Sequence, residues 1–171
     1  MLVILVGKTC SGKTTLRQEF QKSGYCTIEA SEWFSRCKQE YHIAGEFNCA
    51  VPLNIYMSSK IIEEFGNRLN HTLLTGLRSL NEYEYFCKYG FNVILIAILC
   101  NDRESYIRSK RRKRDFTGGY TEFLANRIQP DMALGLDRLI QKADITIENQ
   151  GISRKDFLRK GMLLIEPYIN K

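Results

Sequence analysis

Short apolar runs along the chain alternate with segments in which apolar residues recur every three or four positions. The apolar runs cover residues 2–6, 25–29, 72–75, 93–99 and 144–147. The first and fourth runs are apolar throughout, which is typical of central strands that a parallel sheet buries on both faces. Between the runs, residues 54–69 carry apolar side chains at helical spacing. The pattern predicts an α/β fold of three layers, in which helices flank a central five-stranded parallel sheet.

Three helix starts are marked by a side-chain oxygen that is followed three residues later by an acidic residue. The pairs are Ser79 with Glu82, Asn101 with Glu104 and Ser153 with Asp156. In this arrangement the first side chain caps a backbone N–H group, and the acidic side chain can return a bond. We therefore expect helices to begin just after residues 79, 101 and 153.

The composition fits one cytoplasmic domain without a membrane segment. The chain has 171 residues, of which 44% are hydrophobic, and this is enough to build one core of ordinary size. The longest apolar run, at residues 93–100, is far shorter than the roughly 20 residues that a membrane helix needs. Six cysteines form no C-x-x-C pair, so we expect reduced thiols. The net charge of +6 indicates anionic partners.

A glycine-rich segment directly follows the first apolar run. Residues 7–14 match the pattern G-x-x-x-x-G-K-[ST], with Gly7, Gly12, Lys13 and Thr14 at the fixed positions. In this pattern the glycines let backbone N–H groups converge on an anion at the start of a helix. The lysine reaches the β- and γ-phosphates of a nucleotide, and the hydroxyl binds Mg²⁺. The alternative is a glycine-rich turn between a strand and a helix that binds nothing.

The pattern therefore predicts an ATP site in which Thr14 is the metal ligand. We expect ATP to contact most of the loop, namely Gly7, Thr9, Cys10, Ser11, Gly12, Lys13, Thr14 and Thr15. No N-K-x-D segment for reading guanine occurs, which argues against a GTPase. The chain is also short for a motor or an AAA-type ATPase.

Four stretches together resemble the P-loop kinases of the nucleoside-monophosphate-kinase-like family, above all dephospho-CoA kinase and related small nucleotide kinases. They are "GKTCSGKTT" at residues 7–15, "TIEASEWFSR" at 27–36, "LLTGLRSLNEYEYF" at 73–86, and the segment 92–151. The resemblance implies a single P-loop kinase domain over residues 1–171, with an acceptor-binding helical region near 31–69 and a lid near 108–127. It also implies ATP and Mg²⁺ as cofactors and a nucleotide-like small molecule as the acceptor.

On the acceptor side, the resemblance implies roles for two acidic and two basic residues. Glu29 or Glu32 would orient the acceptor or take the proton of an attacking hydroxyl, with Glu29 assigned to catalysis and Glu32 to acceptor binding. An acceptor that is already a phosphate would need no such base. The alternative is that both acidic residues only favour a helix start. Arg36 and Arg78 would bind the acceptor, although Arg78 could instead form an ion pair with Glu82 across one helical turn.

The basic run at residues 108–115 places Arg108, Arg111 and Arg112 on one helix face, since they lie three and four positions apart. Guanidinium groups clamp phosphate oxygens in two-point fashion. We expect Arg108 and Arg112 to act in catalysis and Arg111 to bind ATP, within a lid that closes over the nucleotide. We expect Arg127 to bind the substrate, with a surface position as the alternative. The alternatives are a solvated basic helix and a nucleic-acid patch. Because no aromatic residues interleave with the run, we do not expect nucleic acid.

The first hypothesis is therefore a kinase that moves the γ-phosphoryl group of ATP to a nucleoside monophosphate, a deoxynucleotide or a dephospho-CoA-like acceptor. A second hypothesis is an ATP-binding module that acts on nucleic acid or on a protein partner. A third is a degenerate P-loop protein that binds nucleotide without turnover. It is favoured by Thr75 at the end of the third strand, where many relatives of the resembled family have Asp. The sequence leaves the acceptor and the oligomeric state open.

Overall fold

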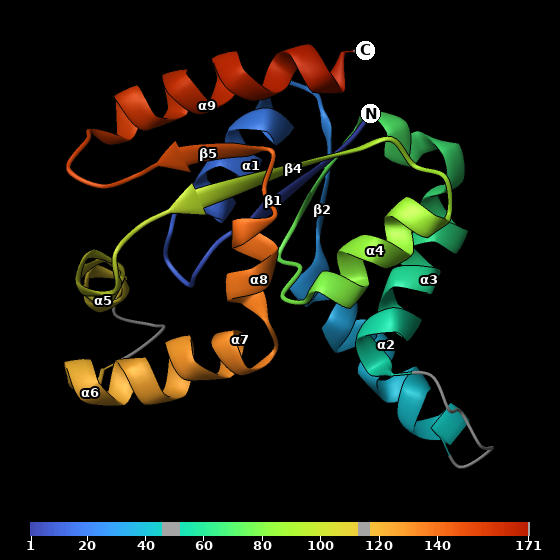
Figure 1. The fold of residues 1–171 in the computed structure, drawn as a ribbon, viewed down its shortest axis with the longest axis horizontal. Helices are drawn as coiled ribbons and strands as arrows, with labels where there is room; N and C mark the ends of the chain where they lie inside the picture. The colour runs from blue at the N-terminus through green and yellow to red at the C-terminus, as the bar shows by residue number, and fades with distance from the viewer. Residues whose placement is uncertain (46–51, 113–116, 171) are drawn as a thin grey trace.

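A computed structural model describes residues 1–45, 52–112 and 117–170, with a five-stranded parallel sheet at its centre (Figure 1). The strands are β1 (Leu2–Val6), β2 (Cys26–Glu29), β3 (Thr72–Thr75), β4 (Val93–Leu99) and β5 (Ile145–Glu148). Their spatial order is β2-β3-β1-β4-β5, and every neighbouring pair is parallel. The predicted α/β fold with a five-stranded parallel sheet is therefore confirmed.

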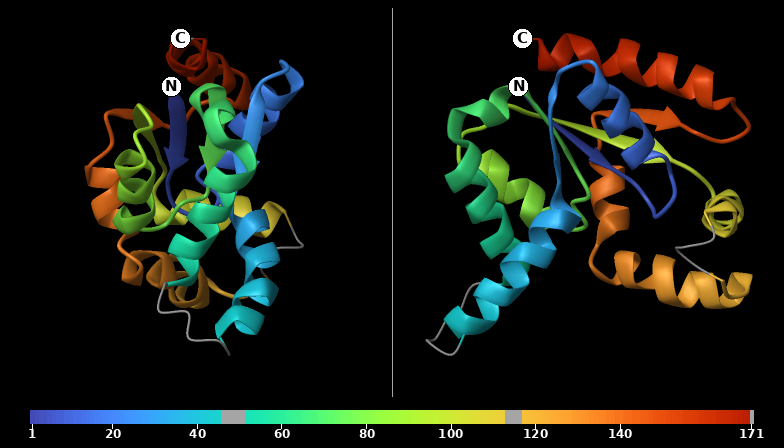
Figure 2. Two further views of the ribbon diagram at one scale, coloured as in Figure 1. Left: turned by 90° about the vertical axis from the view of Figure 1, so that its right-hand side faces the viewer. Right: turned by 180° about the vertical axis from the view of Figure 1, so that it is seen from behind.

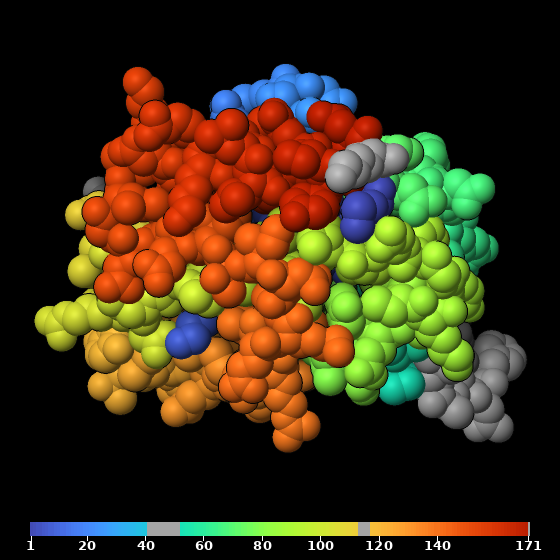
Figure 3. Space-filling view, turned by 45° about the horizontal axis from the view of Figure 1, so that its top comes forward, coloured from blue at the N-terminus to red at the C-terminus, as the bar shows by residue number. Residues whose placement is uncertain are grey.

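Helices cover both faces of the sheet (Figure 2). One face is packed by α1 (Lys13–Lys22) and α9 (Arg154–Ile169), and α9 lies across the face that Figure 3 presents. The other face is packed by α2 (Ala30–Gly45), α3 (Leu53–Phe65), α4 (Leu80–Lys88) and α8 (Leu136–Gln141). Along β1, Val3 and Leu5 pack on the face that α1 and α9 cover, and Ile4 packs on the opposite face. Successive side chains of a strand point to opposite faces of the sheet. Burial of all five residues of β1 fixes the point at which the following loop begins.

Four short elements project beyond the carboxyl ends of β4 and β5 (Figure 1). They are α5 (Asp102–Arg111), α6 (Tyr120–Phe123), a π-helical turn η2 (Leu124–Ile128) and α7 (Gln129–Ala133). The lid predicted near residues 108–127 covers the end of α5, all of α6 and most of η2 but none of α7, and its residues 113–116 lie outside the described part. The turn η2 carries Arg127, and π-helical turns are frequent at functional sites.

All three predicted helix caps are present. Ser79 and Glu82 form a full capping box at the start of α4. The Asn101 side chain accepts from the Glu104 N–H at 2.7 Å. The Ser153 hydroxyl accepts from the Asp156 N–H at 3.1 Å, and these caps set where α5 and α9 begin.

Three predicted boundaries differ by a few residues. Strand β2 begins one residue late, at Cys26, and the Tyr25 ring packs against Phe20 with 5.3 Å between ring centroids. Strand β5 begins at Ile145, because the Asp144 carboxylate accepts the Leu95 N–H at 2.8 Å. The helix expected over residues 54–69 ends at Phe65, because Gly66 adopts a φ of +50° and a 3₁₀ helix η1 (Gly66–His71) follows. Within the described ranges, no helix is long and apolar enough to span a lipid bilayer.

Candidate functional site

The loop between β1 and α1 has the backbone of an anion cradle. Gly7 and Gly12 adopt φ values of +146° and +117°, which disfavour any other residue. A Cβ atom at Gly7 would lie 2.4 Å from the carbonyl oxygen of Ile98, and one at Gly12 would lie 2.4 Å from Nδ2 of Asn149. Helix α1 begins at Lys13 with no side-chain cap and no acidic residue in its first turn. Its first N–H groups and its dipole therefore favour an anion.

The Lys13 ammonium lies under this loop. It donates to the carbonyl oxygen of Gly7 at 2.6 Å and to that of Lys8 at 2.9 Å. Burial lowers the pKa of Lys13 to about 8, although the nearby carboxylates of Glu29 and Asp131 oppose the shift. An anionic ligand would favour the charged form of this side chain.

Two cavities meet at the loop. The donor cavity, of about 720 Å³, is bounded by the loop, α5 and the start of α9, and the reaction cavity, of about 230 Å³, is bounded by the loop and the ends of β2 and β3. Cys10, Thr14 and Arg112 line both cavities. The other predicted residues that line the donor cavity are Gly12, Thr15, Arg108 and Arg111, and those that line the reaction cavity are Gly7, Thr9, Lys13, Glu29, Arg78 and Arg127.

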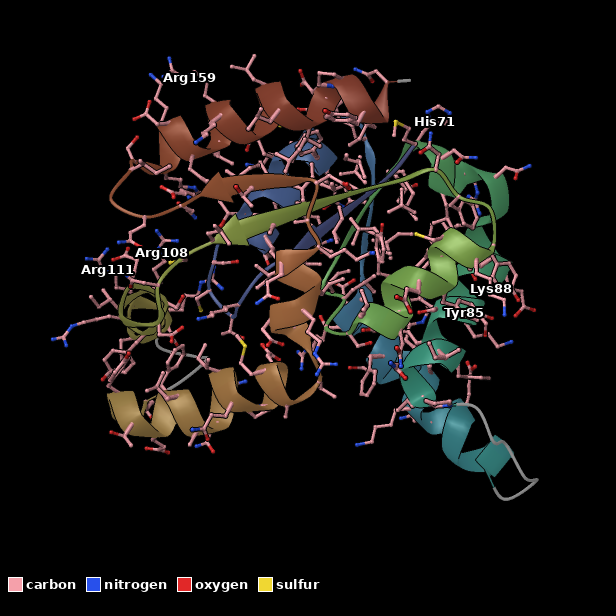
Figure 4. The ribbon with its side chains drawn as sticks, in the orientation of Figure 1. His71, Tyr85, Lys88, Arg108, Arg111 and Arg159 are labelled. Carbon is pink, nitrogen blue, oxygen red and sulfur yellow. The ribbon has the colours of Figure 1, made fainter. Side chains whose placement is uncertain are left out.

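The far wall of the donor cavity is tied to the loop by Arg108 and Asn149. Arg108 Nη2 donates to the Asn149 carbonyl oxygen at 2.7 Å, and its Nε donates to Glu104 Oε1 at 3.0 Å. The buried Asn149 side chain donates through Nδ2 to the Ser11 carbonyl oxygen at 2.6 Å. Arg108 and Arg111 extend from α5 toward the β5–α9 connection (Figure 4). Through these bonds Arg108 stabilises the wall of the donor cavity. Ser11, which was expected to contact ATP, lines neither cavity.

The carboxylate of Glu29 stands at the end of β2 beside the end of β3. Strand register pairs Glu29 with Thr75, and the Thr75 hydroxyl donates to Glu29 Oε2 at 2.7 Å. The Ser31 hydroxyl donates to Oε1 at 3.2 Å. Strand β3 therefore ends in a hydroxyl that holds a carboxylate from the neighbouring strand.

The guanidinium of Arg78 pairs with Asp131. Arg78 Nη1 lies 3.3 Å from Asp131 Oδ1, and Asp131 is buried at the start of α7. In the described part of the chain, the Arg78 guanidinium forms no ion pair with the Glu82 carboxylate, so that alternative is wrong. Glu82 instead accepts the backbone N–H groups of Arg78 and Ser79, which completes the cap of α4, and burial raises the pKa of Glu82.

A third cavity, of about 380 Å³, adjoins the reaction cavity, and we call it the acceptor cavity. The two share Ser31, Gly76 and Arg78. Phe34, Met57 and Leu134 supply apolar wall, and the half-exposed Arg78 supplies a positive charge at the junction. This combination suits a molecule with an apolar or planar body and an anionic group.

Two predicted acceptor residues lie elsewhere. The Glu32 side chain is 67% exposed and pairs with Arg17, with Nη2 and Oε1 3.5 Å apart. The Arg36 guanidinium lies over the Trp33 ring, 4.7 Å from its centroid, and lines a separate hollow between α2 and α3. Local stacking on Trp33 thus holds Arg36 away from the reaction cavity.

Solved structures share the fold of this chain. A shikimate kinase from Bacteroides thetaiotaomicron has a TM-score of 0.64 at 12% identity, covering 96% of this chain and 97% of that one. A sugar kinase from a Janibacter species has a TM-score of 0.62 at 16% identity, covering 98% and 96%. The fold is that of the P-loop kinases. A gluconokinase from Sinorhizobium meliloti also shares it, with a TM-score of 0.58 at 11% identity over 98% and 93% of the two chains.

Relatives in sequence are named UPF0200 proteins. The chain is 36% identical over 89 residues to the UPF0200/UPF0201 protein of Archaeoglobus fulgidus, which is 52% of this chain and 27% of that protein. It is 31% identical over 96 residues to the UPF0200 protein of Staphylothermus marinus, covering 56% of this chain and 50% of that one. A match to the UPF0200 protein of Thermococcus kodakarensis is 24% identical and covers both chains fully. No protein-family model matches the chain. None of these relatives or solved structures is named as a dephospho-CoA kinase, so that part of the resemblance stays a prediction.

Proposed function

We propose that the chain is an ATP-dependent kinase that phosphorylates a small molecule. The observation that carries the proposal is the junction of the donor and reaction cavities at an uncapped helix start, with Lys13 beneath it. A triphosphate held by the loop would lie with its γ-phosphate toward the reaction cavity. The solved structures that share the fold are named as small-molecule kinases, which supports the same interpretation.

The residues at the junction fit the donor chemistry. Lys13 would neutralise the β- and γ-phosphates, and Arg112, which lines both cavities, would stabilise charge on the transferring group. Thr14 lines both cavities as well, so its hydroxyl fits the role of a ligand to Mg²⁺. The metal, when bound with ATP, neutralises charge that develops on the phosphates. Arg108 and Asn149 would keep the donor cavity in shape.

The acceptor side fits a hydroxyl nucleophile on an anionic molecule. Glu29 lines the reaction cavity and is held by hydroxyl donors, so it could accept the proton of an attacking hydroxyl. Arg78 and Arg127 would bind the anionic part, and the apolar wall would contact the rest. A nucleotide-like acceptor with a free hydroxyl, such as a dephospho-CoA-like molecule, meets these requirements. A nucleoside monophosphate would need Arg78 and Arg127 but not Glu29.

The test is phosphoryl transfer from Mg-ATP, measured with purified protein and a panel of acceptors. The panel holds nucleoside and deoxynucleoside monophosphates, dephospho-CoA, shikimate and gluconate. We expect one class to gain a phosphate and the Lys13→Ala variant to lose the activity. ATP binding with no phosphorylated product from any acceptor would contradict the proposal. Retained activity after Glu29→Gln would favour a phosphate acceptor over a hydroxyl.

A further inference from the structure

Arg17 lies one turn beyond Thr14 on α1 and faces two carboxylates. Its Nε is 3.5 Å from Glu29 Oε2, and its Nη2 is 3.5 Å from Glu32 Oε1. The side chains of Arg17 and Glu29 are each only 13% exposed, whereas Glu32 is largely in solvent. The nearly buried charge pair is therefore Arg17 with Glu29.

The two oxygens of Glu29 have different surroundings. Oε2 accepts from the Thr75 hydroxyl and faces Arg17. Oε1 accepts from Ser31 and lies against Gly76, where an added Cβ atom would be 2.4 Å away. Ser31 and Gly76 line both the reaction and the acceptor cavities. Oε2 is thus the anchored oxygen, and Oε1 is the one beside the cavities.

One of the N–H donors of the Arg17 side chain makes no hydrogen bond with the described residues. Its Nε is buried and has no hydrogen-bond partner among the described residues. A buried donor without a partner is unfavourable for folding, so stability alone is a poor reason for an arginine here. Its charge, by contrast, lies close to Glu29 Oε2. The residue belongs to α1, the helix that begins in the phosphate loop.

We propose that Arg17 is a positioning residue for Glu29, and this inference rests on the proposed kinase function. The guanidinium attracts Oε2, which also accepts from the Thr75 hydroxyl, and this orientation keeps Oε1 at the wall that an acceptor hydroxyl would approach. Arg17 also links the helix that starts at the phosphates to the carboxylate of the acceptor side. Movement of α1 would therefore change the position of the Glu29 carboxylate.

The experiment is a double-mutant cycle on turnover. The variants are Arg17→Met, Arg17→Lys, Glu29→Gln and the double variant Arg17→Met/Glu29→Gln. The acceptor is the one that the panel reveals. Arg159→Met is the matched control, because Arg159 extends from the outer side of α9 and pairs with Asp156, which lies three residues before it (Figure 4).

We expect Arg17→Met to lower kcat about 10- to 100-fold, as small displacements of a catalytic group do, with the KM for ATP within about twofold. Arg17→Lys should recover part of the loss, and Arg159→Met should leave kcat unchanged. In the Glu29→Gln background, Arg17→Met should have no further effect on kcat, because the group that it positions is already gone.

An equal loss of kcat from Arg17→Met in both backgrounds would overturn the inference, as would an unchanged kcat. Thermal melting of each variant separates loss of fold from loss of positioning. If Arg17→Met alone unfolds, Arg17→Lys takes its place in both backgrounds of the cycle. An unmodified chain that binds ATP but phosphorylates no acceptor would instead remove the proposed function, and this inference with it.

Discussion

Raising the pH should weaken nucleotide binding by discharging Lys13. Its pKa is lowered to about 8 because the side chain is buried beneath the loop. A polyphosphate needs the ammonium form, so affinity is full below pH 8 and falls as the pH rises through that value. If only the charged form binds, the apparent Kd should increase about 10-fold between pH 7 and pH 9, which corresponds to about 1.4 kcal/mol.

The assay is calorimetric titration with a non-hydrolysable ATP analogue and Mg²⁺. Near pH 8, binding should take up roughly half a proton, so the measured enthalpy should depend on the ionisation enthalpy of the buffer. Lys13→Met should bind weakly with no such dependence. Cys10→Ser should keep the dependence, which separates the lysine from the thiol in the same loop. A constant Kd between pH 7 and pH 9, with the same enthalpy in every buffer, would refute the reasoning.

Three further predictions concern single side chains. Gly12→Ala should abolish the rise in melting temperature that Mg-ATP gives the unmodified chain, because the new Cβ atom meets the Asn149 amide at 2.4 Å; an undiminished rise would contradict the described loop. Thr75→Val should lower the free energy of unfolding in urea by about 1 kcal/mol, since Glu29 loses a hydrogen bond, and an unchanged value would mean that this bond contributes nothing. Arg78→Ala should raise the KM for the acceptor at least about 10-fold, because the acceptor loses a charged contact, while the KM for ATP stays nearly constant. The measurement is steady-state kinetics, and a larger rise in the KM for ATP than in that for the acceptor would contradict the prediction.

The fold could be predicted because its main signals are local in the sequence. The apolar runs that become β1 and β4, and the capping pairs at Ser79 and Asn101, need no knowledge of the rest of the chain. The start of β5, by contrast, depends on another segment. The Asp144 carboxylate, for example, bonds to the N–H of Leu95 on another strand, and that contact is invisible in a short window of sequence.

The donor side of the site was predictable for the same reason, because one segment carries the whole phosphate loop. The acceptor side joins residues that are far apart in the chain. Glu29 meets Thr75 through the register of two strands, and Arg78 meets Asp131 through the packing of α7. No sequence pattern marked Asp131 or Arg17, since each has its place only through the folded chain. The family resemblance implied an acceptor-binding role for Arg36, but its guanidinium stacks on Trp33, one helical turn before it.

The central claim is that the backbone of residues 9–15 holds the phosphates of ATP. The most direct measurement is a titration of ¹⁵N-labelled protein with Mg-ATP, followed by the amide signals in NMR spectra. We expect saturable shifts that are largest at residues 9–15 and absent in the Lys13→Ala variant at the same ligand concentrations. Unmoved amide signals in this loop at saturating Mg-ATP, or shifts confined to other parts of the chain, would contradict it.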